Sequence, residues 1–311
     1  MYAIWNLTNT CPWHCKFCCV SAKWGPIANR ELSLGQVAND ELCLESKMEI
    51  LRQLIGCGIE IDFSGGDPLY FEDDYSVISR AVEKVPKGMI HVSTTGAAFS
   101  NRKLEILKRV GNVELTLDSL DDMDNPYRPN GYSSLSMRAL KKLVSAGVNC
   151  SAVTILYPLT MTQDNLASLH KWLCENDIAQ WSILKFCTAG RGVGQKELVA
   201  SNEEYLATMR FIEGLGGSVL VAFQHSLKVL AGQYVCHAAH GSIGILPDGT
   251  VVSCAWALDR DGRPLDGFRL GKLPEEDLVD VLKRALASDA YKCRPTTCRI
   301  IEHFKLGGSE V

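Results

Sequence analysis

The alternation of strand-like and helical segments over residues 1–192 is the feature that most restricts the fold. Apolar runs of strand length lie near residues 3–7, 59–63, 89–94, 113–117, 149–156 and 181–187. Helical patterns lie between them, for instance at 33–54, 75–84, 104–110, 134–146 and 166–175. Alternation of this kind predicts an α/β fold with parallel strands and right-handed crossovers. Six units are too few to close an eight-stranded barrel.

The composition is that of a globular protein with a full core, since 46% of the 311 residues are hydrophobic. No apolar run approaches the ~20 residues that span a bilayer, and the first residues lack the pattern of a secretory signal. A net charge of −4 gives no support to a nucleic-acid partner. Thirteen cysteines without a signal favour metal binding in a reducing compartment over disulfides. We therefore expect a cytoplasmic protein with neither a membrane nor a nucleic-acid partner.

Three cysteines stand close together directly after the first strand-like run, in Cys11-Pro12-Trp13-His14-Cys15-Lys16-Phe17-Cys18. Three thiolates on one short loop can hold three irons of a [4Fe–4S] cluster and leave the fourth iron open to a substrate or cofactor. A structural zinc site is an alternative, with His14 or Cys19 as the fourth ligand. A redox dithiol is a further alternative, although it does not need the third thiol.

Residues suited to a ligand follow the second and third predicted strands. The second ends in Gly65-Gly66-Asp67-Pro68, where two glycines let the backbone approach a ligand and the carboxylate can accept hydrogen bonds from an ammonium group. The third ends in small hydroxyl residues, Ser93 and Thr95 among them, which suit a ribose or a carboxylate. Taken alone, both segments are also ordinary turn signals.

The fourth and sixth strands end in similar fashion. The fourth is followed by Asp118-Ser119 and then by Arg128, whose guanidinium can pair with a carboxylate. The sixth leads into Gly190-Arg191-Gly192, where the glycines permit a backbone edge to approach a flat ligand. The alternatives are a solvated loop arginine and a simple turn.

The order of these segments makes residues 1–192 resemble the radical S-adenosylmethionine (SAM) superfamily. The resemblance implies an open (β/α)6 partial barrel of the TIM type, with the active site at the C-terminal ends of its strands. It implies that Cys11, Cys15 and Cys18 hold a [4Fe–4S] cluster. Once reduced by a donor such as flavodoxin or ferredoxin, this cluster would cleave SAM to a 5′-deoxyadenosyl radical, which abstracts a hydrogen atom from a substrate.

The resemblance also assigns the strand ends to SAM. The segment at 65–68 is similar to the family's G-G-E-P motif, which binds the SAM amine, with Asp67 in place of the usual Glu. Arg128 would pair with the SAM carboxylate, and the turn at 190–192 would lie near the adenine. The implied SAM-binding residues are Gly65, Gly66, Asp67, Pro68, Ser93, Thr95, Asp118, Ser119, Arg128, Gly190 and Arg191.

The chain after residue 192 predicts a separate region with its own cysteines. A helical linker at 193–217 leads to a strand-like run at 219–223, and Pro247-Asp248-Gly249 between apolar runs predicts a hairpin with Cys254 on its return strand. A helical stretch at 278–287 would carry the chain back toward the C-terminus. The expected domains are 1–192, the linker, and 218–311.

The G-x4-C element from Gly249 to Cys254 resembles the SPASM and twitch extensions, which hold auxiliary iron–sulfur clusters. The resemblance implies one auxiliary [4Fe–4S] cluster on Cys236, Cys254, Cys293 and Cys298. The four residues between the last two cysteines depart from the commonest endings, which leaves open whether the fourth iron has a protein ligand. Zinc held by four cysteines is the alternative. Two further cysteines, Cys19 and Cys187, are candidate hydrogen donors in catalysis.

These implications lead to one expected activity. A fully ligated auxiliary cluster can accept an electron, which favours net oxidation: cross-linking of a ribosomal peptide or dehydrogenation of a small molecule. Because the first strand begins at once, we expect no leader-binding domain before it, which favours a small molecule or a peptide recruited by a partner. The alternatives are a redox-neutral epimerase, which needs a thiol donor, and a non-catalytic electron carrier or redox sensor.

Overall fold

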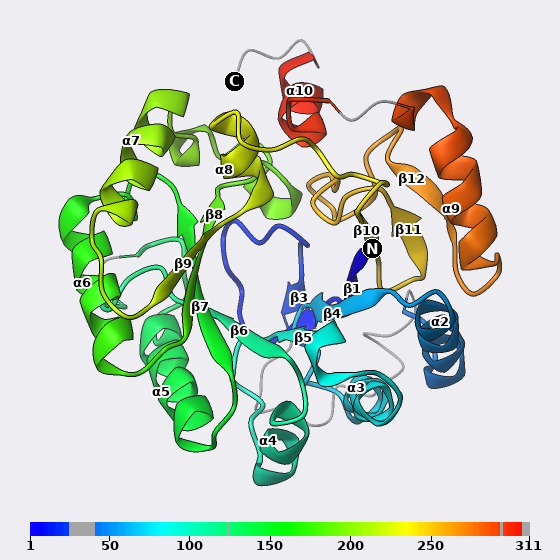
Figure 1. Ribbon diagram of the computed structural model, residues 1–311, viewed down its shortest axis with the longest axis horizontal. Helices are drawn as coiled ribbons and strands as arrows, with labels where there is room; N and C mark the ends of the chain where they lie inside the picture. The colour runs from blue at the N-terminus through cyan, green and yellow to red at the C-terminus, as the bar shows by residue number, and fades with distance from the viewer. Residues whose placement is uncertain (25–40, 123–124, 293–294, 307–311) are drawn as a thin grey trace.

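Six parallel strands form the part of the structure that the sequence predicts as a barrel. The computed structural model describes residues 1–24, 41–122, 125–292 and 295–306. In spatial order the six strands are β1 (Tyr2–Thr8), β4 (Glu60–Gly65), β5 (Ile90–Ser93), β6 (Asn112–Thr116), β7 (Cys150–Leu156) and β8 (Gln180–Lys185). Each pairs in parallel with the next, and together they curve around a common centre (Figure 1). The expected open α/β barrel is confirmed.

Amphipathic helices cover the outside of these strands (Figure 1). They are α2 (Leu44–Gly56), α3 (Glu72–Lys84), α4 (Asn101–Leu107), α5 (Tyr132–Ser145), α6 (Gln163–Glu175) and α7 (Asn202–Glu213). Several begin at side chains that cap free backbone N–H groups, as Ser100 and Thr162 do for α4 and α6. The predicted helices agree with these bounds to within a few residues, apart from the first. That helix was expected from residue 33, and the part of it up to residue 40 lies outside the described residues.

The two faces of the strands differ in polarity because successive side chains point to opposite sides. On β4, Ile61 and Phe63 are fully buried in the main apolar core. The intervening Asp62 lies on the other face and accepts hydrogen bonds from Ser93 Oγ at 3.1 Å. On the neighbouring strands Ser151 Oγ donates to Glu114 Oε1 at 3.2 Å. The interior of the barrel is therefore partly polar, whereas the layer between strands and helices is apolar.

Strands from the second half of the chain extend both edges of this sheet. Strand β9 (Leu220–Phe223) pairs in parallel with β8, so the run expected in a separate domain is a strand of the main sheet. At the other edge, β10 (Ser242–Ile245) pairs in parallel with β1, followed by β11 (Thr250–Val252) and β12 (Arg269–Lys272), both antiparallel. In the sheet formed by the described residues, β12 and β9 are the two edges.

The predicted hairpin is present as β10 and β11, with Gly249 in its turn at φ +86°. A Cβ at this glycine would lie 2.0 Å from the carbonyl oxygen of Leu273, so only glycine fits there. Cys254 lies two residues beyond the end of β11, so its expected position on the return strand is wrong. The pairing ends at Val252, and the chain turns through residues 253–257 toward the barrel mouth.

The remaining elements are short. They are β2 (Thr10–Cys11), β3 (Lys23–Trp24), α8 (His225–Leu230), α9 (Leu278–Ala287), α10 (Arg299–Leu306) and four 3-10 turns at Lys87–Met89, Gly190–Gly192, Lys196–Leu198 and Asp289–Tyr291. Helix α9 has the bounds that the sequence predicts. Within the described part of the chain, every helix is too short or too polar to cross a membrane.

Candidate cofactor site at the barrel mouth

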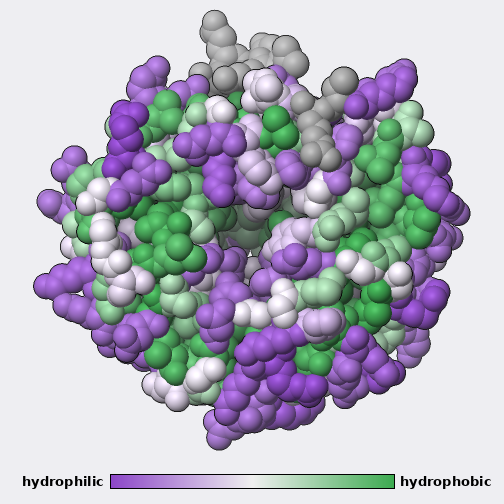
Figure 2. All heavy atoms as spheres, viewed as in Figure 1, coloured by the Kyte–Doolittle hydropathy of each residue, from purple (hydrophilic) through white to green (hydrophobic). Residues whose placement is uncertain are grey.

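The loop with the three closely spaced cysteines begins at the C-terminal end of β1. One residue after β1, the short strand β2 ends at Cys11 and pairs in parallel with β3, and the loop between the two strands carries Cys15 and Cys18. Cys11 and Cys15 are buried, and Cys18 is half-buried. In Figure 1 this dark blue loop lies across the centre of the ring of strands, and the space-filling view of the same face is hollowed at its centre (Figure 2).

The three thiols are close enough to affect one another's ionisation. Burial raises the pKa of Cys11 above its ordinary value, and Asp67, Cys18 and Cys15 raise it further. Burial also raises the pKa of Cys15, whereas the Arg128 guanidinium opposes that shift. Binding of a positive metal relieves such repulsion, because cysteine binds metals as the thiolate.

Three closely spaced thiols suit a cluster with one open iron, whereas a structural zinc ion takes four ligands. A zinc ion needs its thiolates about 2.3 Å from one centre. In an iron–sulfur cluster each thiolate binds a different iron, so the sulfurs lie further apart. The donor set of Cys11, Cys15 and Cys18 therefore fits a [4Fe–4S] cluster with one open iron.

Arg128 connects this loop to the end of β6. Its Nη1 donates to Cys15 Sγ at 3.3 Å, while Nε and Nη2 both lie 2.7 Å from Asp118 Oδ2. The guanidinium carbon lies 4.5 Å from the ring centre of Phe17 and 4.8 Å from that of Tyr132. The sequence analysis did not predict the contact of either ring with Arg128. Only Phe17 could have been suspected, because it lies between two of the cysteines. The structure therefore places Arg128 against a cluster thiol and gives it an acidic partner.

Asp67 is fully buried and lies beside the same loop. Its carboxylate accepts hydrogen bonds from Thr94 Oγ1 at 2.8 Å, Thr95 Oγ1 at 2.5 Å and the Leu69 N–H at 3.1 Å. Its own N–H donates to the carbonyl oxygen of Thr10, the residue before Cys11. The carboxylate thus joins the end of β4 to the end of β5. The hydrogen bond of Thr94 was not predicted, because a run of hydroxyl residues does not indicate which side chain faces the neighbouring strand.

The glycines before Asp67 are required by close contact between backbone segments. A Cβ at Gly66 would lie 2.1 Å from the carbonyl oxygen of Thr10, and one at Gly65 would lie 2.4 Å from that of Thr8. Gly65 also has φ +123°. The end of β4 can therefore lie directly against the residues that lead into the cysteine loop.

The turn after β8 also holds the cysteine loop. Arg191 donates from Nε to the carbonyl oxygen of Cys15 at 2.9 Å and from Nη1 to that of Ala22 at 2.6 Å. A Cβ at Gly190 would lie 2.4 Å from the carbonyl oxygen of Cys18. These residues hold the middle and the C-terminal end of the loop.

Of the other predicted SAM contacts, Pro68 is buried next to Asp67, and Ser93 donates to Asp62 inside the barrel. Ser119 donates to the carbonyl oxygen of Asp121 at 2.8 Å. The structure thus places Gly65, Gly66, Asp67, Arg128, Gly190 and Arg191 against the cysteine loop, whereas Ser93 and Ser119 bond elsewhere; the roles of all these residues toward SAM stay predictions.

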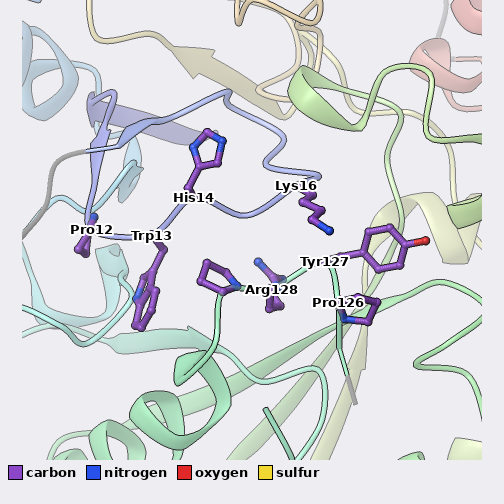
Figure 3. Close-up of a pocket in the computed structure, with 8 residues that line it drawn as sticks. Pro12, Trp13, His14, Lys16, Pro126, Tyr127 and Arg128 are labelled. Atoms are coloured by element: carbon purple, nitrogen blue, oxygen red, sulfur yellow. The ribbon is translucent and has the colours of Figure 1, made fainter. Parts of the chain in front are cut away.

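A cavity of about 440 Å³ lies between the cysteine loop and the segment before α5 (Figure 3). Its lining residues come from these two segments only: Pro12, Trp13, His14, Lys16, Pro126, Tyr127, Arg128 and Pro129. The Lys16 N–H donates to the carbonyl oxygen of Tyr127 at 3.0 Å, which holds the two segments together. The Trp13 indole N–H is buried without a partner among the described residues. The sequence gave no signal for this cavity.

The second group of cysteines comes from the segment before β10, which carries Cys236, and from the region after β11. Cys254 and Cys298 pack against one apolar cluster of Ala257, Phe268 and Ile300. The N–H of Cys236 donates to the carbonyl oxygen of Pro295, three residues before Cys298. Cys293 lies outside the described residues.

The family is decided by comparison with known proteins. A family model described as the radical SAM superfamily matches residues 5–173, more than half of the chain. The chain belongs to the radical SAM superfamily. Members of this family use a [4Fe–4S] cluster and SAM, in agreement with the donor set of Cys11, Cys15 and Cys18. These are the cofactors that the sequence predicts for the barrel.

Curated relatives are distant. The chain is 23% identical over 309 residues to the PqqA peptide cyclase of Granulibacter bethesdensis, with 94% of this chain and 77% of the relative covered. It is 28% identical over 210 residues to the AdoMet-dependent heme synthase of Nitratidesulfovibrio vulgaris, with 65% of this chain and 52% of that one covered.

Solved structures share the fold. Streptococcus suis SuiB bound to the precursor peptide SuiA superposes with a TM-score of 0.70 at 16% identity, over 94% of this chain and 65% of the SuiB chain. SuiB bound to SAM superposes with a TM-score of 0.71 at 15% identity, over 96% of this chain and 73% of the SuiB chain. The structure of anSMEcpe with bound AdoMet superposes with a TM-score of 0.66 at 14% identity, over 94% of this chain and 78% of the anSMEcpe chain. This chain thus spans about two thirds of the SuiB chain in the peptide complex.

Proposed function

We propose that this radical SAM enzyme removes hydrogen from a peptide substrate and forms a cross-link within it. The observation that carries the proposal is the position of the second group of thiols. The segment that carries Cys254 continues to Leu258, whose carbonyl oxygen accepts a hydrogen bond from the Gly190 N–H at 3.2 Å. The next N–H, that of Arg191, donates to the carbonyl oxygen of Cys18 at 2.9 Å. The segments that carry Cys18 and Cys254 therefore adjoin one turn at the barrel mouth.

The residues around the cysteine loop would hold and orient the barrel cofactors. When bound, the reduced [4Fe–4S] cluster supplies the electron that cleaves SAM, so that the nucleoside fragment can take a hydrogen atom from the substrate. Arg128 positions the Cys15 thiolate and balances negative charge next to it. Asp67 fixes the ends of β4 and β5 at the position where the SAM methionine group would bind. A flavodoxin or ferredoxin is the expected source of the electron.

Within the region 218–311, the part that follows β9 would form a SPASM or twitch-like auxiliary site after the barrel (1–192) and the linker (193–217). Cys236, Cys254 and Cys298 are its described thiols, and Cys293 is the fourth cysteine that the sequence predicts. An auxiliary cluster there supplies an acceptor for the second electron, so the substrate loses two hydrogens in total, one as an atom and one as a proton. This balance supports oxidation over epimerisation.

A peptide substrate is supported by the relatives. The PqqA peptide cyclase matches nearly the whole chain, and SuiB was solved with its precursor peptide. A small-molecule substrate is the second candidate, supported by the match of 65% of the chain to a heme synthase.

The decisive experiment measures which class of molecule loses hydrogen. Extract from native cells grown in heavy water is separated by size, and each fraction is incubated without oxygen with reconstituted enzyme, SAM and reductant. We expect deuterium in 5′-deoxyadenosine only with the peptide fraction, and a peptide product lighter by two hydrogens. Deuterium only with the low-mass fraction would establish the small-molecule candidate instead. The Cys15→Ala variant is the control and should form no 5′-deoxyadenosine with either fraction.

A further inference from the structure

One cysteine of the barrel, Cys187, lies among the thiols of the tail. Cys187 follows β8 by two residues, yet it packs against the same apolar cluster as Cys254 and Cys298. These three cysteines come from the barrel, the turn after β11 and the residue before α10. Segments so distant in sequence bring their thiols together only in the folded protein.

These thiols also affect one another's ionisation, in keeping with their packing against one apolar cluster. Burial raises the pKa of Cys187 well above its ordinary value, and the next contributions come from Cys298 and Cys254. Burial raises the pKa of Cys254 to about 12, with Cys298 and Cys236 adding to it. Cys236 also raises the pKa of Cys298, after burial as the largest cause. The charges that most affect Cys187 are therefore the tail thiols, ahead of Cys19.

Hydrogen bonds fix this arrangement. The Gly190 N–H, three residues after Cys187, donates to the carbonyl oxygen of Leu258, four residues after Cys254. Ser21 Oγ donates to the carbonyl oxygen of Arg260 at 2.8 Å, so the cysteine loop also contacts the tail segment. The distance between the Cys187 and Cys254 segments is thereby set by the backbone.

We propose that Cys187 binds one iron of the auxiliary cluster, together with Cys236, Cys254 and Cys298. The inference rests on the auxiliary cluster of the proposed function. Four thiolates give each iron of a [4Fe–4S] cluster one protein ligand. Buried thiols that repel one another as thiolates become favourable ligands once iron neutralises them. In this role Cys187 has no S–H to return to a substrate radical, which replaces its predicted role as a hydrogen donor and further favours oxidation.

The test isolates the auxiliary cluster. In a full-length background with Cys11, Cys15 and Cys18 changed to alanine, only the tail site can hold iron. Five variants are then made in this background: Cys187→Ala, Cys187→Ser, Cys254→Ala, Cys293→Ala and Cys150→Ala. Cys150 is the matched control, because it is a buried barrel cysteine whose pKa is raised by burial alone. Iron and sulfide per chain and the electron paramagnetic resonance (EPR) spectrum of the reduced protein are measured after anaerobic reconstitution.

We expect about four irons per chain in the background, the Cys150→Ala protein and the Cys293→Ala protein. The Cys187→Ala and Cys254→Ala proteins should lose iron or show a changed EPR spectrum. Cys187→Ser should recover iron with shifted g-values, because a serine oxygen can replace the thiolate as a ligand. Such recovery separates ligation from packing, and circular dichroism confirms folding of each variant.

Two results would overturn the inference alone. One is a Cys187→Ala protein with the iron content and spectrum of the Cys150→Ala control. The other is loss of the cluster in Cys293→Ala but not in Cys187→Ala, which would make Cys293 the fourth ligand. Two other results would instead remove the auxiliary cluster from the proposed function. One is a triple-alanine background protein that binds no iron, and the other is a Cys254→Ala protein that keeps its full iron content.

Discussion

The guanidinium of Arg128 donates a hydrogen bond to the thiol of Cys15 at 3.3 Å. The same guanidinium is bound to Asp118, and both side chains are nearly inaccessible to solvent. A positive charge held rigidly against a cluster ligand lowers the cost of adding negative charge to that cluster. The pair of Arg128 and Asp118 therefore belongs to the cluster environment as much as to any SAM contact.

The first prediction concerns Arg128→Gln. Removal of the cation leaves the Asp118 carboxylate buried without its partner, which should destabilise the protein by about 3–5 kcal/mol. It should also shift the potential of the barrel cluster to a more negative value, because the reduced state loses a neighbouring positive charge. Denaturant unfolding and a redox titration of the Cys254→Ala background measure the two effects. The double variant Arg128→Gln with Asp118→Asn should regain stability, whereas the potential of its barrel cluster should stay more negative than that of the wild type. A wild-type cluster potential in both variants would contradict the electrostatic role of Arg128.

The second prediction concerns Asp67→Glu, which restores the residue usual in the family. The added methylene has no space, because the carboxylate is fully buried against Thr94 and Thr95. We expect a loss of about 1–3 kcal/mol in stability and weaker SAM binding. Thermal unfolding and calorimetric titration with SAM test this, with the surface change Asp261→Glu as the control. A variant that binds SAM as tightly as the wild type would show that the site tolerates either acid.

The third prediction concerns Gly66→Ala. Its Cβ would lie 2.1 Å from a backbone oxygen of Thr10, and backbone atoms cannot move aside as a flexible side chain can. We expect little soluble protein and no iron on the cysteine loop. Gly56→Ala is the matched control, since a Cβ at Gly56 meets nothing within 4 Å and alanine is favoured in a helix. Equal iron content in the two variants would refute the proposed backbone contact.

The fourth prediction concerns the dependence of stability on pH. Burial raises the pKa of Asp62 to about 7, and Glu114 adds to this shift. Because the folded-state pKa is higher than the unfolded one, the associated stability is full below about pH 4 and is lost as the pH rises toward 7. At 1.36 kcal/mol per pKa unit, the loss can reach about 4 kcal/mol.

Asp62→Asn should remove most of this loss. Relative to the wild type, the variant should be more stable at pH 8 and similar at pH 4, as measured by urea unfolding across this range. Asp261→Asn, on an exposed loop, is the control and should follow the wild type. A constant difference between Asp62→Asn and the wild type across the range would mean that Asp62 does not titrate in the barrel.

Sequence reasoning located most elements because their signals are local. Apolar runs of strand length and the period of the helices need no knowledge of distant contacts, and α9 was predicted at its observed bounds. The cysteine spacing likewise identified the cluster loop, since three thiols within eight residues must share one loop. Among the residues grouped as SAM contacts, Arg128 and Arg191 donate hydrogen bonds to that loop, whereas Ser93 and Ser119 bond elsewhere.

Only the tertiary structure decided which groups these side chains meet. The contact of Arg128 with Cys15, the burial of Asp67 against Thr94, and the approach of Cys187 to Cys254 join residues far apart in the sequence. The same holds for β9, which the sequence assigns to the tail but which pairs with β8. Pairing and contact of this kind depend on how the strands and loops are arranged in space. A local sequence pattern does not predict that arrangement, because it contains no information on distant contacts. The sequence by itself thus determined the elements and the donor atoms, and the packing of the barrel mouth determined their partners.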